Sequence, residues 1–135
     1  GQGLVVQSTS YLACTPGVNI DVGFPGPRRA FKSALAGEWV FWLDVTGQGL
    51  VLLSSFGAIY EKEVQGEYVI DSGHIVAYEK TLEYSIGKPK GSSWLSTFLG
   101  GEGFVCNFRG HGKVYCQTHN PGTFGQLVGS QLPPR

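Results

Sequence analysis

The chain repeats one stretch of its own sequence. Residues 12–51 read LACTPGVNIDVGFPGPRRAFKSALAGEWVFWLDVTGQGLV, and residues 76–114 read VAYEKTLEYSIGKPKGSSWLSTFLGGEGFVCNFRGHGKV. A repeat of this length is typical of a supersecondary unit whose apolar face needs a neighbouring copy to cover it. The duplication therefore favours an assembled architecture, and a scaffold over a catalyst. The matched positions include Ala13 with Ala77, Val18 with Leu82, Ile20 with Tyr84, Gly23 with Gly87, Leu35 with Leu99, Glu38 with Glu102, and Gly47 and Gly49 with Gly110 and Gly112.

The repeat also predicts how the chain is divided. We expect a first β unit over residues 1–66, which holds an N-terminally truncated copy and the first full repeat. A second unit with a C-terminal helix is expected over residues 67–135. The string GQGLV at residues 1–5 recurs at residues 47–51, where a full strand precedes it. This recurrence predicts that a preceding strand has been removed, by processing or by the choice of segment.

Composition limits the classes of function that are open to the chain. Ten basic residues balance ten acidic ones, and only 15% of the residues are charged. Such a chain has no long-range field to attract nucleic acid, which we do not expect as a partner.

No run of about 18 apolar residues is present, so no membrane-spanning helix is predicted. Three cysteines without a C-x-x-C pair favour a reducing compartment. We expect a cytoplasmic protein, with a processed or exported form as the alternative.

The spacing of apolar segments predicts an all-β fold. Segments rich in β-branched and aromatic residues are interrupted every 8 to 12 residues by turn-forming residues, as in small antiparallel sandwiches or barrels. Gly47–Gly49 and Gly110–Gly112 are predicted hairpin turns, and residues 65–67 and 71–73 further reversals. Strands are expected near residues 3–8, 11–14, 18–24, 39–46, 49–55, 58–64, 67–71, 74–79, 81–86, 103–109 and 112–118.

Only the C-terminus has a helical pattern. Asn120 can cap a helix that begins with Pro121. Phe124, Leu127 and Val128 would then share one face, and Pro133-Pro134 would prevent continuation.

Cys106 and Cys116 lie symmetrically about the predicted turn at Gly110–Gly112. A three-residue loop would place the two thiols opposite each other. Period-two alternation would then bury one face of the hairpin. Two reduced, buried thiols are the favoured interpretation, and a cross-strand disulfide is the alternative. The residues on that face would be Phe104, Cys106, Phe108, Val114 and Cys116.

No catalytic or metal-binding pattern is recognisable. Nucleophilic catalysis needs a nucleophile, a base and a group that orients the base, and no such spacing occurs. His74, His111 and His119 would share a metal with the two cysteines only if all five converged, which their predicted positions oppose. We expect no enzyme activity, no metal and no cofactor. Gly37-Glu38 and Gly101-Glu102, which recur at the exits of two loops, are expected to be structural, as are Gly110 and Gly112.

Those two loops, residues 23–38 and 87–102, are the candidate binding segments. Each places cations beside aromatic side chains, a mixture that suits a subunit interface, an anionic ligand or a membrane surface. The plainer interpretation is that the aromatics plug the end of a sandwich and the cations are solvated. The residues concerned are Arg28, Arg29, Phe31, Lys32, Lys88, Lys90, Trp94 and Phe98.

The string GEGFVCNFRGHGKVYCQTHNP at residues 101–121 resembles the C-terminal signature of the altered-inheritance-of-mitochondria (mitochondrial biogenesis) family. SSFGAI at residues 54–59 and DSGHIVAYE at residues 71–79 resemble two of its internal motifs. The resemblance covers essentially the whole chain. It implies a fold like that of the tryptophan RNA-binding attenuation protein (TRAP), built from tandem small β domains that close into rings, commonly trimers. It supplies no catalytic residues.

Together these observations predict a self-assembling structural protein that forms a ring-like oligomer, of trimer type, or a filament. The alternative is a module that binds an anionic ligand or membrane surface through the paired basic-aromatic loops.

Overall fold

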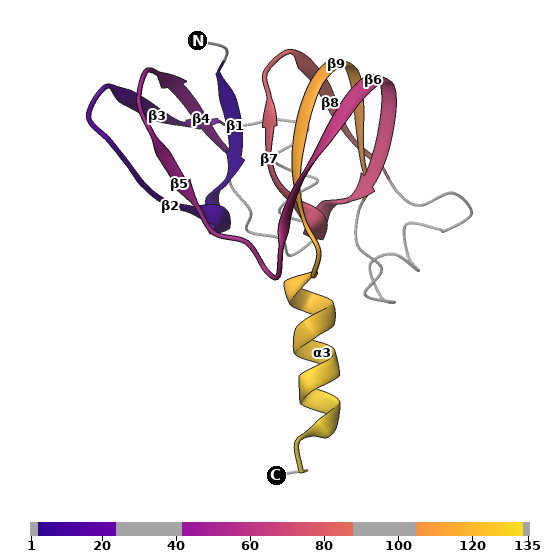
Figure 1. The fold of residues 1–135 in the computed structure, drawn as a ribbon. Coiled ribbons are helices and arrows are strands. Elements are labelled where there is room, and N and C mark those ends of the chain that lie inside the picture. The colour runs from indigo at the N-terminus through magenta and orange to yellow at the C-terminus, as the bar shows by residue number, and fades with distance from the viewer. Residues whose placement is uncertain (1–2, 24–41, 88–104, 134–135) are drawn as a thin grey trace.

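The computed structural model describes residues 3–23, 42–87 and 105–133 (Figure 1). Over these residues the fold is all-β with one C-terminal helix, as the sequence predicts. Two short 3-10 turns, η1 and η2, follow the strands β1 and β6. The elements are β1 (Leu4–Gln7), η1 (Ser8–Ser10), β2 (Tyr11–Cys14), β3 (Val18–Gly23), β4 (Trp42–Gly47), β5 (Val51–Leu53), β6 (Ile59–Asp71), η2 (Ser72–His74), β7 (Ile75–Glu79), β8 (Leu82–Gly87), β9 (Val105–Gln117) and α3 (Pro121–Gln131).

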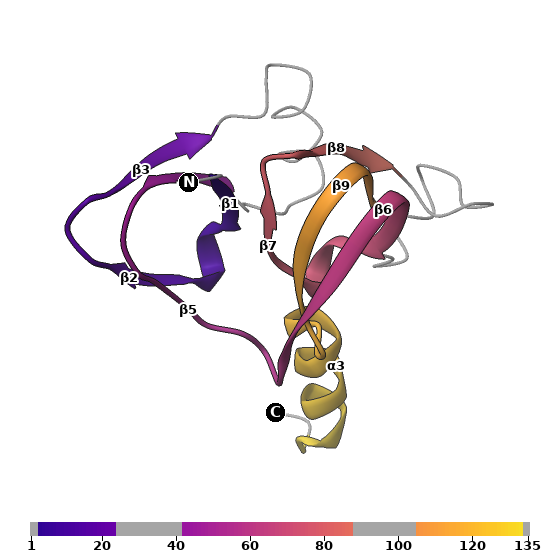
Figure 2. The same ribbon diagram turned by 45° about the horizontal axis from the view of Figure 1, so that its top comes forward.

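The strands form one curled seven-stranded sheet and a separate pair. The order in the large sheet is β3-β4-β1-β7-β9-β6, with β8 also paired to β9, and β2 pairs with β5. All pairings are antiparallel. Figures 1 and 2 show two β units side by side, with α3 projecting below the second.

The duplication in the sequence is repeated in the elements. An offset of 64 places β1, η1, β2 and β3 on the end of β6, η2, β7 and β8 in turn. An offset of 63 places β4 and β5 on the two halves of β9. We call β1 to β5 the first unit, and residues 68–117 the second unit. The expected boundary after residue 66 falls inside β6, which passes through it without a break.

The predicted hairpin at Gly110–Gly112 is wrong. β9 is one strand of 13 residues and pairs along its whole length with β6, so that Gly110 lies opposite Gly66. The reversal predicted at residues 65–67 is wrong for the same reason. Both glycines have positive φ, 119° and 106°, which lets the two strands coil together without ending. Cys106 and Cys116 are therefore ten residues apart on one strand and cannot form a disulfide.

The buried face predicted for this segment is nevertheless confirmed. Cys106, Phe108, Val114 and Cys116 are fully buried, and the cysteines are not in disulfides. Phe104 lies outside the described residues.

Gly47–Gly49 is also not a hairpin turn. β4 pairs with β1 and β3, whereas β5 pairs with β2, so the chain passes here from one sheet to the other. Gly47 has a φ of 97°, and a Cβ atom at this position would lie 2.2 Å from the carbonyl oxygen of Gly17. The sharp change of direction therefore requires glycine.

The C-terminal helix forms where the sequence predicts it. The side chain of Asn120 accepts a hydrogen bond from the Gly122 N–H at 2.9 Å, and Pro121 occupies the first turn. No residue of α3 is buried, and Phe124, Leu127 and Val128 form an exposed apolar stripe.

Candidate functional site

The two units meet edge to edge at the pairing of β1 with β7. Leu4, Val5 and Val6 lie opposite Glu79, Tyr78 and Ala77. The Lys80 N–H donates to the Gly3 carbonyl at 3.0 Å, and the Lys80 ammonium forms an ion pair with Asp44 on β4. We call this contact the internal junction. It is continuous backbone pairing between two copies of the same unit.

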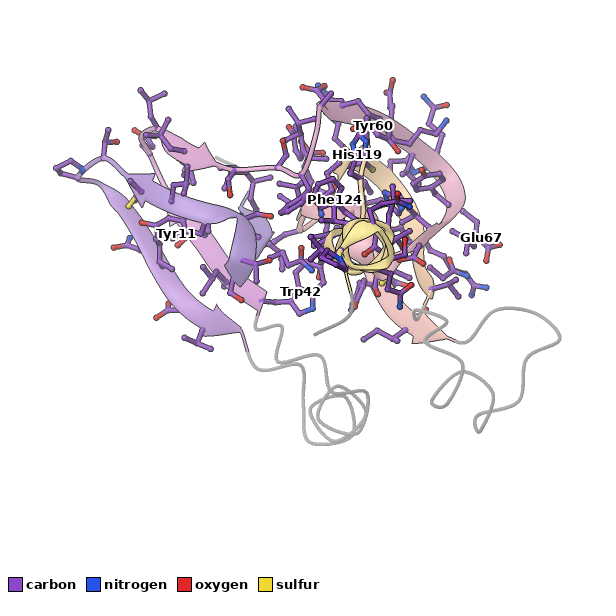
Figure 3. The ribbon with its side chains drawn as sticks, turned by 90° about the horizontal axis from the view of Figure 1, so that it is seen from below. Tyr11, Trp42, Tyr60, Glu67, His119 and Phe124 are labelled. Carbon is purple, nitrogen blue, oxygen red and sulfur yellow. The ribbon has the colours of Figure 1, made fainter. Side chains whose placement is uncertain are left out.

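Side chains from each unit complete the core of the other across this junction. Val76 and Ala77 of β7 are fully buried in the core of the first unit. Trp42, from β4, belongs to the core of the second unit, and Val5 packs against that core. The Trp42 ring meets those of Tyr78 and Tyr84 edge to face, with centroids 5.6 and 5.4 Å apart. Figure 3 shows Trp42 between the two units.

A β-bulge directs one of these side chains. The register of β7 against β9 shifts between Ile75 and Ala77, and Val76 is the extra residue. The same shift occurs in the first unit between Tyr11 and Ala13, where Leu12 is the extra residue. Val76 is fully buried by the neighbouring unit, whereas Leu12 is 62% exposed. The first unit therefore has the same bulge without a neighbour against it.

Five of the described strands have a partner on one side only, namely β2, β3, β5, β6 and β8, and we call the free edges of β2 and β6 the outer edges. Among the described strands, β2 pairs only with β5, and β6 only with β9. In Figure 1, β2 runs along the lower left of the first unit and β6 along the right of the second. Val69 on β6 is 53% exposed, while its counterpart Val5 packs in the internal junction. Two of the exposed apolar residues, Leu12 and Val69, thus occur where the duplication predicts a contact.

Sequence reasoning did not single out Leu12 or Val69. The repeat held the necessary signal, because an offset of 64 places Leu12 on Val76 and Val5 on Val69. That signal becomes informative only when the partners of β1 and β7 are known.

A pocket of about 540 Å³ lies where the linker after β5, the end of β9 and the start of α3 meet. Its central side chain, Gln117, accepts a hydrogen bond from the Phe56 N–H and donates to the Gly73 carbonyl, at 2.9 and 2.8 Å. The His74 ring lies 2.9 Å from the Gln117 carbonyl oxygen. These contacts hold the linker and η2 against β9, which is a structural use of the polar groups.

The basic-aromatic loops lie outside the described residues, and so do Gly37, Glu38, Gly101 and Glu102. In the part of the chain that the structure describes, no three His, Cys, Asp or Glu side chains gather as metal ligands would. None of its helices is long and apolar enough to cross a membrane. The remaining predicted structural residues, Gly110, Gly112, Cys106 and Cys116, all lie on β9.

The core beside the outer edge of β6 makes the folding stability depend on pH, and this dependence can be measured. Burial raises the pKa of Tyr68 from 10.0 to about 12, and nearby Cys116 adds to the rise. Because the folded chain holds this proton to higher pH than the unfolded chain, the contribution of Tyr68 to stability is complete below pH 10 and is lost as pH rises to 12. Burial also raises the pKa of the Cys116 thiol, so part of the loss begins near pH 9.

Tyr68→Phe is therefore expected to flatten the loss of stability above pH 10. Urea unfolding at pH 8, 10 and 11.5, under reducing conditions, measures the difference between the variant and the parent. Parallel curves for the two proteins across this range would contradict the assignment to Tyr68.

Comparison with known proteins identifies the family of this chain. Residues 1–119 match the family model described as mitochondrial biogenesis AIM24. The chain belongs to the AIM24 family. The family expected from the sequence motifs is thereby confirmed.

Relatives of this AIM24 chain occur in Streptococcus pyogenes. An uncharacterized protein of serotype M6 is 34% identical over 95 residues, which are 70% of this chain and 38% of the relative. The crystal structure of a protein from Streptococcus pyogenes superposes with a TM-score of 0.78 at 26% identity, and covers 97% of this chain and 56% of that one. The AIM24 chain thus spans about 40–60% of the length of these relatives.

Proposed function

We propose that the chain is a non-enzymatic structural protein that assembles with itself, as a ring-like oligomer or a filament of TRAP-like units. The observation that carries the proposal is the internal junction, in which one unit already binds another by strand pairing and exchange of core residues. Unpaired strand edges are open to association with further chains unless they are covered. The outer edges of β2 and β6 are of this kind among the described strands.

The solution mass across a dilution series tests this function. Light scattering is expected to give a discrete oligomer if the contact closes into a ring, or a mass that grows with concentration if it does not. A monomer at every concentration would overturn the proposal.

A second candidate function rests on the sequence of the paired loops. Both loops carry cations next to aromatic residues in the same order, which suits an anionic ligand or a membrane surface. The double substitution of Arg28 and Arg29 by glutamate separates the two functions. Loss of binding to vesicles that contain anionic lipid, with an unchanged solution mass, would favour the second candidate.

A further inference from the structure

We propose that β6 of one copy pairs antiparallel with β2 of the next copy, with Val69 opposite Cys14. This contact would repeat the internal junction between molecules. The inference rests on the proposed self-assembly and names the surfaces and the register through which it occurs. The partner is a second copy of this chain.

The register follows from the duplication. Val5 lies opposite Tyr78 in the internal junction. An offset of 64 converts Val5 to Val69 and Tyr78 to Cys14. The same operation places Ile70 opposite Ala13. β1 and β6 also pair with their inner neighbours in equivalent registers, because Leu4 lies opposite Val45 and Tyr68 lies opposite Phe108. The free edge of β6 therefore has the same register relative to its inner neighbour as the edge of β1 that pairs with β7.

The hydrogen-bonding groups of β6 agree with this register. The Thr118 N–H donates to the Ala58 carbonyl at 2.9 Å. These two residues continue the register of β6 with β9, in which Ile59 lies opposite Gln117, and they form a hydrogen-bonded pair. Because bonded and non-bonded pairs alternate in an antiparallel ladder, even-numbered residues of β6 direct their backbone groups toward β9. Val69 is odd-numbered, so its N–H and carbonyl point to the outer edge.

The edge of β2 offers the complementary groups. The Thr15 N–H donates to the Leu50 carbonyl at 3.0 Å, so Thr15 directs its backbone N–H and carbonyl toward β5. Cys14, one residue earlier, therefore directs its N–H and carbonyl away from β5. Val69 and Cys14 can then exchange both hydrogen bonds, as the register requires.

The side chains fit the same arrangement. Leu12 is the bulge residue that corresponds to Val76, which is buried in the adjoining unit. In the proposed contact, Leu12 would be covered by the second unit of the neighbouring copy. Leu12 and Val69 are 62% and 53% exposed in the single chain, and both would lose this exposure.

The contact between copies lacks two interactions of the internal junction. Lys80 corresponds to Pro16, which has no N–H to donate and no charge. Asp44 corresponds to Asn107, so the ion pair has no equivalent either. The contact between copies should therefore dissociate on dilution before the internal junction opens.

Disulfide trapping tests the register. Opposed residues at a hydrogen-bonded pair have Cα atoms about 5.5 Å apart, which is within the range of a disulfide. Val69→Cys is expected to link to Cys14 of the next copy under mild oxidation, giving a series of covalent multimers on a non-reducing gel. Glu63→Cys lies on the same edge about 20 Å away and is the matched control. Linking of Val69→Cys should be at least about tenfold faster than that of the control. It should be lost when Cys14 is also changed to serine.

Substitution of the bulge residue tests the surface. Leu12→Asp is expected to raise the concentration for half-assembly by roughly 30-fold or more, because a buried apolar anchor is replaced by a charge. Leu50→Asp is the matched control, since Leu50 is 72% exposed and its counterpart Lys113 belongs to neither of the two core clusters that meet at the internal junction. Circular dichroism would establish that both variants are folded.

The outcomes separate this inference from the function on which it rests. A parent protein that assembles, with no difference between each variant and its control, would overturn the interface and leave the function standing. A parent protein that is monomeric throughout would overturn both.

Discussion

Phe108→Ala is expected to lower the free energy of unfolding by about 3–5 kcal/mol, which is the usual cost of removing a fully buried phenylalanine. Phe108 has no exposed surface, and its ring lies 5.0 and 5.6 Å from those of Tyr78 and Tyr84. The cavity would open inside the aromatic cluster that Trp42 joins from the first unit. Small domains are stable by about 5–15 kcal/mol, so the variant should be largely unfolded on modest warming.

Phe56→Ala is the matched control for this experiment. Phe56 is 43% exposed and makes one ring contact, with Phe124 at 5.6 Å. Its replacement should cost about 1 kcal/mol or less. Urea unfolding followed by far-ultraviolet circular dichroism measures both variants. Equal losses from the two substitutions would show that the core is not centred on Phe108.

Gly47→Ala is expected to have the second large effect, because two penalties act at one position. A positive φ costs a residue with a side chain about 1–3 kcal/mol. A Cβ atom would also press on the backbone carbonyl of Gly17, which cannot move as a flexible side chain would. We therefore expect a loss of stability about twice that at a position with the first penalty alone.

Gly66→Ala supplies that comparison. Its φ is 106°, and an added Cβ would meet nothing within 4 Å, so only the conformational cost applies. Thermal unfolding of the two variants under identical conditions measures the difference. If Gly66→Ala is the more damaging variant, steric contact is not what requires glycine at the bend after β4.

Much of the fold could be predicted from the sequence, because the alternation of apolar and polar residues and the spacing of turn-forming residues are local signals. The strands at residues 4–7, 11–14, 18–23, 75–79 and 82–87 and the capped helix lie within a residue or two of their expected bounds. The burial of Cys106 and Cys116 was predicted for an incorrect reason. A hairpin with a three-residue turn and a continuous strand both keep even-numbered residues on one face, so alternation alone does not distinguish them.

The pairing of strands could not be predicted in this way. Gly-x-Gly between apolar segments is typical of a tight turn, and only the partner strand decides whether the chain reverses or coils onward. At Gly110–Gly112 the partner is β6, which lies more than 40 residues away in the sequence. The predicted interface loops fell outside the described residues. The edges that carry the proposed contact emerged only once β1 and β7 were seen to be neighbours.

The internal junction has a consequence for how the molecule responds to dilution. Its two halves belong to one polypeptide, so each finds the other at an effective concentration set by the connecting chain and not by the amount of protein in solution. Substitutions at the β1·β7 pairing should therefore change the melting temperature equally at all protein concentrations. Because of the duplication, one copy of the contact forms within the chain as it folds. The proposed copy at the outer edges forms between molecules, so its population depends on the protein concentration.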